Sequence, residues 1–157
     1  MLVCALGDRW NALAAKWDGH ANGNLCVFPD IHAAMSELRA GDGAAVERRV
    51  QAMRKTAADG SELGAIYRDI GLPVVAGLIA FHHGRYTEAI EHLLTARFDL
   101  WKMGGSKAQR DVIDWTLAEA AVRSGQRDIA VSLAHERLAM RVHSIPNRRL
   151  LEESLAA

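Results

Sequence analysis

The chain has 157 residues, and a chain of this length forms one domain that buries roughly 70% of the surface it exposes when unfolded. Half of the residues are hydrophobic and 24% are charged, which is the composition of a folded protein and excludes wholesale disorder. There are 19 basic and 19 acidic residues, so the formal net charge is zero. A balanced charge supplies no overall attraction to nucleic acid or to an anionic membrane, and we expect neither as a partner.

The N-terminal part is predicted to contain one helix at residues 8–17 and then a helix pair at residues 28–58. Pro29 and Asp30 suit the first turn of this pair, because proline leaves no N–H unpaired there and a carboxylate favours the positive end of a helix. The glycines of Gly41-Asp42-Gly43 then separate the two helices of the pair. The second helix carries an apolar stripe at helical spacing, formed by Val46, Val50, Met53 and Ala57.

The rest of the chain is predicted to hold two further helix pairs and a short last helix, at residues 72–103, 106–143 and 147–156. Leu72-Pro73 opens the first of these pairs, again with a proline in the first turn. Ser106 and Gln109 have the spacing of a capping box, in which each side chain accepts a hydrogen bond from the other residue's backbone N–H. Pro146 breaks the chain before the last helix. Proline is otherwise rare and alanine, leucine, arginine and glutamate are frequent, which favours an all-α protein.

The two cysteines, Cys4 and Cys26, have no C-x-x-C spacing, and no histidine lies at zinc-ligand spacing. We therefore expect reduced, buried thiols and neither a metal nor another cofactor. Residues 1–6 have no basic leader, and the apolar run from Gly71 to Phe81 is shorter than the ~20 residues that cross a bilayer. By elimination, these features predict a cytoplasmic location.

Three glycines, Gly41, Gly84 and Gly125, recur at intervals of 43 and 41 residues, each between two predicted helices. Residues seven positions before and five positions after each glycine are small or, at one position, β-branched: Ala34, Gly77 and Ala118 before, Val46, Ala89 and Ala130 after. Small side chains at these points let two antiparallel helices approach closely. The pattern predicts helical hairpins that follow one another in series.

The second copy of this pattern, residues 77–90, reads Gly-Leu-Ile-Ala-Phe-His-His-Gly-Arg-Tyr-Thr-Glu-Ala-Ile. It resembles the core of a tetratricopeptide repeat, in which a Gly-x-Tyr-x-Glu-Ala turn joins two helices. The third copy has Arg127 in place of the tyrosine, and the first has Glu37 where the repeat has a small or aromatic residue. The resemblance implies an all-α, right-handed superhelical stack of antiparallel helix pairs, a tetratricopeptide-like α-solenoid formed by residues 1–157 as a single domain.

Two segments on either side of this repeat carry a more specific resemblance. Residues 28–35 (Phe-Pro-Asp-Ile-His-Ala-Ala-Met) contain a Phe-x-Asp-x-His sequence, and residues 104–112 read Gly-Gly-Ser-Lys-Ala-Gln-Arg-Asp-Val. Both are similar, in this order, to segments of the tetratricopeptide repeat protein 38 family, so the similarity covers most of the chain. Members of that family are longer and their matching part is C-terminal. The resemblance implies a fold and no defined activity.

Four polar residues, Asp30, His32, Gln109 and Arg110, are candidates for a ligand site. An amide and a guanidinium beside a helix N-terminus favour a carboxylate or a phosphate. The capping box with Ser106 also explains Gln109, so Arg110 is the residue that capping leaves unexplained. Asp30 and His32 point to different sides of a helix, and a histidine buried between hairpins is the alternative interpretation. Convergence of all four residues would indicate a small-ligand binder or part of an enzyme.

The resemblance also implies that the first helix of each hairpin lines a concave groove. One stripe on these helices is apolar with charged edges; it comprises Met35, Arg39, Leu78, Phe81, His82, Trp115, Glu119 and Arg123. Such a groove suits a peptide or a partner helix, and the alternative is that another helix of this protein or another copy fills it. The other tryptophans, Trp10, Trp17 and Trp101, are predicted to lie in the core.

No catalytic signature stands out in the sequence: it has no Gly-x-Ser-x-Gly elbow, dinucleotide-binding glycine motif, Walker loop or His-Glu-x-x-His. The arginine pairs at 48–49 and 148–149 lack interleaved aromatic residues, which argues against a nucleic-acid surface. The expected function is an interaction scaffold that presents a concave surface to a peptide or protein partner, without catalysis. Self-association into a homo-oligomer through apolar end faces is expected if capping repeats are lacking.

Overall fold

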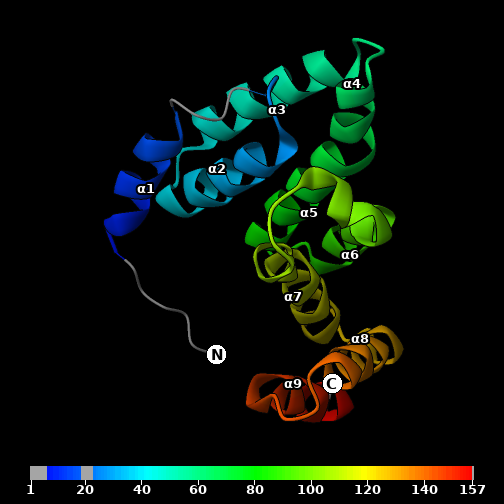
Figure 1. Cartoon of the computed structure of the whole chain (residues 1–157). Helices are drawn as coiled ribbons and strands as arrows, with labels where there is room; N and C mark the ends of the chain where they lie inside the picture. Colours follow the sequence, from blue (N-terminus) through cyan, green and yellow to red (C-terminus); the bar gives the residue numbers. More distant parts are fainter. Residues whose placement is uncertain (1–6, 19–22, 157) are drawn as a thin grey trace.

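A computed structural model describes residues 7–18 and 23–156, and throughout these ranges the secondary structure is helical, without a strand. The all-α prediction is therefore confirmed (Figure 1). The helices are α1 (Arg9–Asp18), α2 (Val27–Ala40), α3 (Gly43–Ala57), α4 (Glu62–Ile66), the π-helical turn η1 (Tyr67–Gly71), α5 (Leu72–His82), α6 (Tyr86–Ala96), the 3₁₀ helix η2 (Arg97–Met103), α7 (Lys107–Arg123), α8 (Arg127–Met140) and α9 (Ile145–Ala156).

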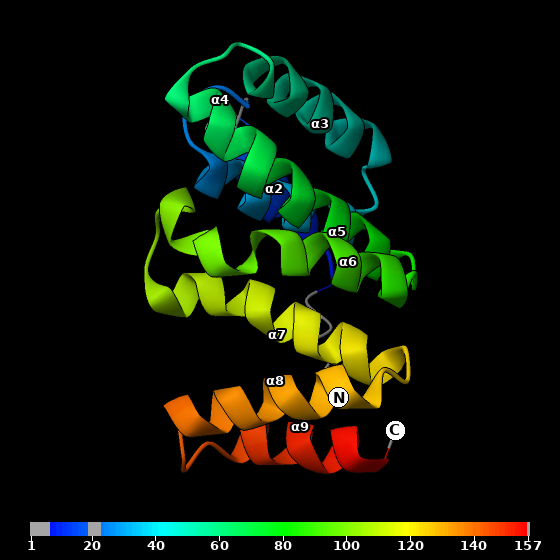
Figure 2. The ribbon, with the colours of Figure 1, turned by 90° about the vertical axis from the view of Figure 1, so that its right-hand side faces the viewer.

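Helices that follow one another in the sequence pack against one another. α2 contacts α3, α5 contacts α6, α7 contacts α8, and α8 contacts α9. The first helices of successive pairs also touch, because α2 contacts α5 and α5 contacts α7, and the last helix, α9, contacts α7 as well. Figure 2 shows the resulting array, in which α3 and α4 lie at one end and α9 at the other. From α5 to α9 the helices follow one another along this array in chain order (Figure 2).

The three recurring glycines lie in the turns between paired helices, as the sequence pattern predicts. Gly41, Gly84 and Gly125 have φ values of 76°, 75° and 71°, in the left-handed region that side chains disfavour. The close helix approach predicted at Gly77 is also present, since a Cβ atom there would lie 2.6 Å from Leu93 on α6. The glycines therefore determine both where the chain reverses and how closely α5 and α6 pack.

The helix predicted to open at Leu72-Pro73 instead begins at Glu62, because α4, η1 and α5 form one continuous helix. Proline normally interrupts a helix, since it lacks an N–H and its ring collides with the carbonyl four residues earlier. In η1 the N–H of Leu72 bonds to the carbonyl of Tyr67, five residues back. This wider turn displaces the carbonyls that the ring of Pro73 would meet, so the helix continues through the proline.

The continuous helix Glu62–His82 has 21 residues, and its most apolar 18-residue window has a mean hydropathy of 1.5. By length and composition it could span a bilayer, which corrects the expectation based on the shorter run from Gly71 to Phe81. Half of that window is buried inside the protein. The core helix of a folded domain meets the same criterion, so length and composition are weak evidence for a membrane span.

The hydrophobic core extends along the whole array. Its largest fully buried side chains come from every helix pair and include Ile31, Met53, Tyr67, Leu93, Ile113, Leu117 and Leu150. On the last helix, α9, Leu150 and Ser154 face inward, whereas Arg148, Glu152 and Glu153 are exposed. The exposed face of α9 is mixed, because Ile145 and Leu155 are exposed together with these charged residues.

The prediction that Trp101 lies in the core is wrong, because 64% of its surface is exposed. α6 ends at Ala96 and continues as the 3₁₀ helix η2, which has three residues per turn. In this register Leu100 and Met103 face the core, and Phe98 and Trp101 face outward. Of the other tryptophans predicted to be buried, Trp10 and Trp17 are half-buried.

Cys26 is a free thiol and is half-buried rather than fully buried. Its Sγ lies 3.8 Å from the carbonyl oxygen of Met103, which links the start of α2 to the end of η2. The other cysteine, Cys4, lies outside the described residues.

Candidate functional site

A hollow of about 610 Å³ lies where α5, α7 and α9 meet. Its apolar wall combines aromatic and aliphatic side chains from all three helices, namely Phe81, Trp115, Val122, Ile145, Pro146 and Leu150. Charged side chains of both signs complete the lining, namely Glu119, Arg123, Arg149 and Glu153. A concave apolar surface with a few polar groups at its edge is the usual form of a binding site.

Arg123 holds a fixed positive charge at the α5 side of the hollow. Its guanidinium carbon lies 4.9 Å from the centroid of the Phe81 ring and 5.6 Å from that of Tyr86. Its Nη2 also donates to Glu119 Oε2 at 3.0 Å. Burial alone would lower the pKa of Arg123, but its hydrogen bond with Tyr86 and the charge of Glu119 outweigh that effect and raise the pKa. These contacts fix the position of the guanidinium before any ligand binds.

Trp115 is held from the α8 side by Arg137. The guanidinium carbon of Arg137 lies 4.8 Å from the centroid of the indole ring. The two Nη atoms of Arg137 donate to the two carboxylate oxygens of Asp111 at 2.9 and 3.0 Å. Asp111 precedes Trp115 by one helical turn. The ion pair between Asp111 and Arg137 therefore fixes the Arg137 side chain over the Trp115 ring that lines the hollow.

A second candidate is a buried charged network that joins α2, α3 and η1. Asp30 Oδ1 accepts hydrogen bonds from the backbone N–H of Gly23 at 2.9 Å and from Arg49 Nη1 at 2.8 Å. Asp30 Oδ2 accepts a bond of 2.6 Å from the hydroxyl of Tyr67. Arg49 also donates through Nε to Glu37 Oε2 at 3.0 Å and through Nη2 to Glu37 Oε1. Asp30, Glu37 and Arg49 are all at least 95% buried.

The groups in this network satisfy one another. Burial and the carboxylate of Asp30 raise the pKa of Tyr67 far above its ordinary value, so its hydroxyl stays protonated and donates. Burial alone would lower the pKa of Arg49, but its bonds to Glu37 and then Asp30 raise it. Both carboxylates are thus occupied by donors from the chain itself. The arrangement fixes the packing of α2, α3 and η1 and presents no open position to a ligand.

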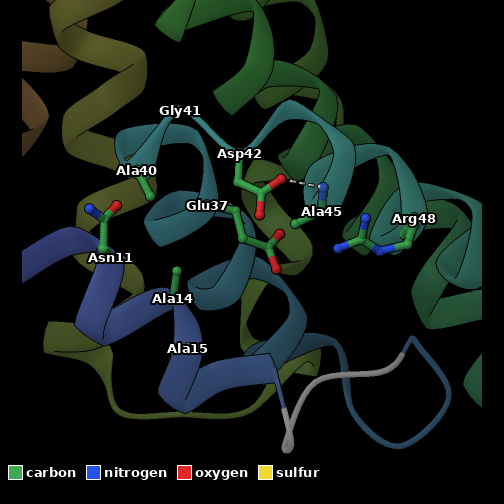
Figure 3. Close-up of a pocket in the computed structure, with 9 residues that line it drawn as sticks. All are labelled: Asn11, Ala14, Ala15, Glu37, Ala40, Gly41, Asp42, Ala45 and Arg48. Carbon is green, nitrogen blue, oxygen red and sulfur yellow. Dashed lines mark hydrogen bonds between the residues drawn. The ribbon is translucent and has the colours of Figure 1, made fainter.

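A third candidate is a cleft of about 510 Å³ between α1 and the turn that joins α2 to α3. Figure 3 shows its polar side chains, with Asn11 on the α1 side and Glu37, Asp42 and Arg48 across from it. Two of these groups have structural roles, because Glu37 binds Arg49 and Asp42 Oδ1 accepts from the N–H of Ala45. Much of the remaining wall is alanine and glycine. The cleft therefore offers fewer contacts to a ligand than the hollow.

The residues predicted to line a concave groove are divided by the structure. Phe81, Trp115, Glu119 and Arg123 come together in the hollow. Leu78 is buried and Met35 is half-buried. Arg39 and His82 are both largely exposed. Partial desolvation, then His83 and then the nearby charge of Arg39 lower the pKa of His82. The guanidinium of Arg39 also lies 5.9 Å from the centroid of the Trp10 ring.

The four polar candidates have different partners. Asp30 belongs to the buried network, and the Gln109 side chain completes the predicted capping box with Ser106, which is confirmed. The Nδ1 atom of His32 lies 2.9 Å from the carbonyl oxygen of Phe28, and the two rings are 4.1 Å apart between centroids. Arg110 Nη1 donates to the carbonyl oxygens of Gly104 and Gly105 at 3.0 and 2.5 Å.

These contacts bring His32 and Arg110 to the same region, but not as a polar site. A Cβ atom at Gly105 would lie 2.4 Å from Cε2 of Phe28, so the loop that Arg110 binds packs directly on the ring that His32 contacts. Asp30 directs its carboxylate to Arg49 and Tyr67 instead. The contacts of His32 and Arg110 thus lie at the junction between α2 and the loop that precedes α7, whereas those of Asp30 join α2 to α3 and η1.

Sequence reasoning missed Arg49, Tyr67 and Arg137, although a signal was present for the two arginines. Arg49 lies among Val46, Val50 and Met53 on the apolar stripe of α3, and it is 95% buried. Arg137 likewise lies on the buried stripe of α8, after Ala130, Leu133 and Ala134. A charged residue at a core position of a helix indicates a buried partner. Glu37, which departs from the repeat pattern, is the partner of Arg49.

Comparison with known proteins finds no family model that matches this chain and no solved structure that matches it. The similarity to the tetratricopeptide repeat protein 38 family therefore remains a prediction from the two segments described above. Within residues 7–18 and 23–156, no group of three or more His, Cys, Asp or Glu side chains is placed to hold a metal ion.

Proposed function

We propose that the protein is a tetratricopeptide-like interaction scaffold, and that the hollow between α5, α7 and α9 binds an apolar segment of a peptide or protein. In this proposal the helix pairs form a right-handed superhelix whose first helices line the concave side. The successive contacts of α2, α5, α7 and α9 support it, as do the glycine turns between pairs. The resemblance of residues 28–35 and 104–112 to the tetratricopeptide repeat protein 38 family supports the same interpretation.

The lining of the hollow is the observation that carries the proposal. Phe81 and Trp115 provide aromatic anchors, and aromatic side chains contribute a large share of binding energy at protein interfaces. Arg123 and Glu119 are already fixed by their mutual ion pair, so they can determine the register of a ligand at little cost in side-chain entropy. In this proposal the apolar side chains of the hollow provide binding affinity, and the fixed charges of Arg123 and Glu119 orient the bound peptide.

The same lining supports binding without catalysis. Thr116 supplies the one hydroxyl among the residues that line the hollow, and its Oγ1 donates to the carbonyl of Val112 at 2.7 Å. No histidine lies among these residues, and Glu119, a carboxylate of the lining, is paired with Arg123. A hydroxyl bonded to its own helix, without an adjacent base, is not an activated nucleophile.

Selection of peptides from a random display library on the immobilised protein tests this proposal. The selected peptides are then measured against Thr116→Trp, which places a large ring inside the hollow. Thr95→Trp is the matched control, because Thr95 is exposed on α6 and makes the same bond to the carbonyl four residues back, at 2.9 Å. We expect Thr116→Trp to weaken binding about tenfold or more and the control to change it less than about twofold.

Two outcomes would contradict the proposal. One is the absence of any peptide enriched over an uncoated surface. The other is equal binding of the selected peptides by both variants, which would place their site outside the hollow. Circular dichroism of Thr116→Trp distinguishes a blocked hollow from an unfolded protein.

A further inference from the structure

A separate cavity of about 200 Å³ lies where the start of α7, the end of α8 and the start of α9 meet. It is lined by Lys107, Asp111, Arg137, Met140, Arg141 and Asn147. Met140 is the one hydrophobic residue of this lining. Three of the six residues are cationic and one is anionic, which leaves an excess of two positive charges.

The floor of this cavity is formed by the ion pair between Arg137 and Asp111, in which both carboxylate oxygens already accept hydrogen bonds. Arg137 is 95% buried, and its two Nη atoms occupy both carboxylate oxygens of Asp111. Asn147, itself buried, accepts from Arg137 Nε at 3.3 Å and donates to the Arg137 carbonyl at 3.0 Å. The negative charge of Asp111 is therefore balanced by Arg137, and the guanidinium is held rigidly.

The two remaining cations carry the excess charge. Arg141 Nη1 is 3.9 Å from Asp111 Oδ2, a distance longer than a hydrogen bond, and the Arg141 side chain is 58% exposed. Lys107 is exposed and forms no ion pair within the part of the chain that the structure describes. Lys107 is also the first residue of α7, where the helix dipole adds positive potential.

From these charges we propose that the cavity binds a phosphoryl dianion, as free phosphate or as the phosphoryl group of a small ester. Lys107 and Arg141 supply the two charges that a dianion requires, and a monocarboxylate would leave one of them uncompensated. Arg137 and Asn147 form a rigid base under the ligand, and the bidentate pair with Arg137 balances the charge of Asp111, which also lines the cavity. This cavity is separate from the hollow, although the Asp111–Arg137 pair borders both, and the proposal does not rest on the proposed function.

Isothermal titration of the whole chain with inorganic phosphate, near neutral pH and at constant ionic strength, tests the proposal. The variant Lys107→Gln/Arg141→Gln removes both exposed cations. The matched control Arg54→Gln/Lys55→Gln removes two exposed cations from adjacent positions of α3 and changes the net charge equally. We expect saturable binding by the unmodified protein, a loss of affinity of about tenfold or more in the first variant, and less than about twofold in the control.

A parallel titration with phenyl phosphate distinguishes the two sources of the dianion. Binding of the ester about threefold or more tightly than phosphate assigns the site to a phosphomonoester, and equal affinity assigns it to free phosphate. The proposal is overturned if phosphate does not bind at about 10 mM. It is also overturned if both double variants lose affinity equally, because binding would then depend on net charge alone. Thermal unfolding of each variant shows whether the fold is intact.

Discussion

The hydroxyl of Tyr67 donates a hydrogen bond of 2.6 Å to Asp30, which lies 37 residues earlier in the chain. Both residues are almost completely buried. Tyr67 is the first residue of the π-helical turn η1, through which the helix Glu62–His82 continues past Pro73. The same turn therefore also forms the hydrogen bond to α2. π-Helical turns are rare, and this one carries a side chain that joins the buried charged network.

The first prediction concerns the ionisation of Tyr67. Its pKa is raised in the folded protein by burial and then by Asp30, so above pH ~10 the unfolded chain loses a proton that the folded chain keeps. The free energy of unfolding is therefore retained in full below pH ~10 and falls as the pH rises above it. The chain has two tyrosines, which makes the absorbance of tyrosinate a simple measure.

Alkaline titration of the native protein and of Tyr67→Phe should give the same rise in tyrosinate absorbance as long as both remain folded. In concentrated denaturant the unmodified chain should give twice the rise of the variant, because both tyrosines then ionise. A larger rise for the native protein than for folded Tyr67→Phe would show that Tyr67 ionises within the fold.

The second prediction compares two adjacent arginines of α3. Arg49→Met leaves the buried carboxylates of Asp30 and Glu37 without their shared cation, which we expect to cost about 3 to 5 kcal/mol of unfolding free energy. Arg48→Met removes an exposed charge and should change stability by less than about 0.5 kcal/mol. Urea denaturation of the two variants measures the difference.

The third prediction concerns the close approach of α5 and α6. Gly77→Ala places a methyl group 2.6 Å from Leu93 and should destabilise the fold by about 1 to 3 kcal/mol. Gly43→Ala is the control, because it lies at the start of α3 with open space around its Cβ position. The control should be neutral or stabilising by up to about 1 kcal/mol. Equal melting temperatures for the two variants would refute the close approach.

The fourth prediction concerns the exposed aromatic residues of η2. Trp101→Ser should change the unfolding free energy by less than about 0.5 kcal/mol, because most of the ring is in solvent. Truncation of a buried tryptophan would instead cost about 3 to 5 kcal/mol. Chemical denaturation with circular dichroism detection avoids reliance on the fluorescence of the residue that is removed.

Local features were predictable from the sequence because their causes are local. The turns at Gly41, Gly84 and Gly125 depend on backbone conformation alone, and the capping box of Ser106 and Gln109 depends on two residues of one turn. The continuation of the helix through Pro73 was not predictable in the same way, since the π-helical turn is stabilised by contacts with α2 and α3.

The candidate site was predictable only in part. Helical spacing alone puts Trp115, Glu119 and Arg123 on one face of α7, and these residues do line the hollow. The contribution of α9 depends on how the chain returns after α8, which no residue spacing specifies. The two side-chain partners of Asp30, Arg49 and Tyr67, could not be predicted, because both are distant from it in sequence and only the fold brings the three residues together.

Methyl-resolved nuclear magnetic resonance with a selected peptide tests the central claim, the position of the binding site, most directly. If the hollow binds the peptide, the methyl signals of Val122, Ile145 and Leu150 should shift with increasing peptide. Those of Leu13 on α1 and Val46 on α3 should remain in place. Shifts confined to α1 and α3, with the three hollow methyl groups unchanged, would contradict the assignment of the hollow as the binding surface.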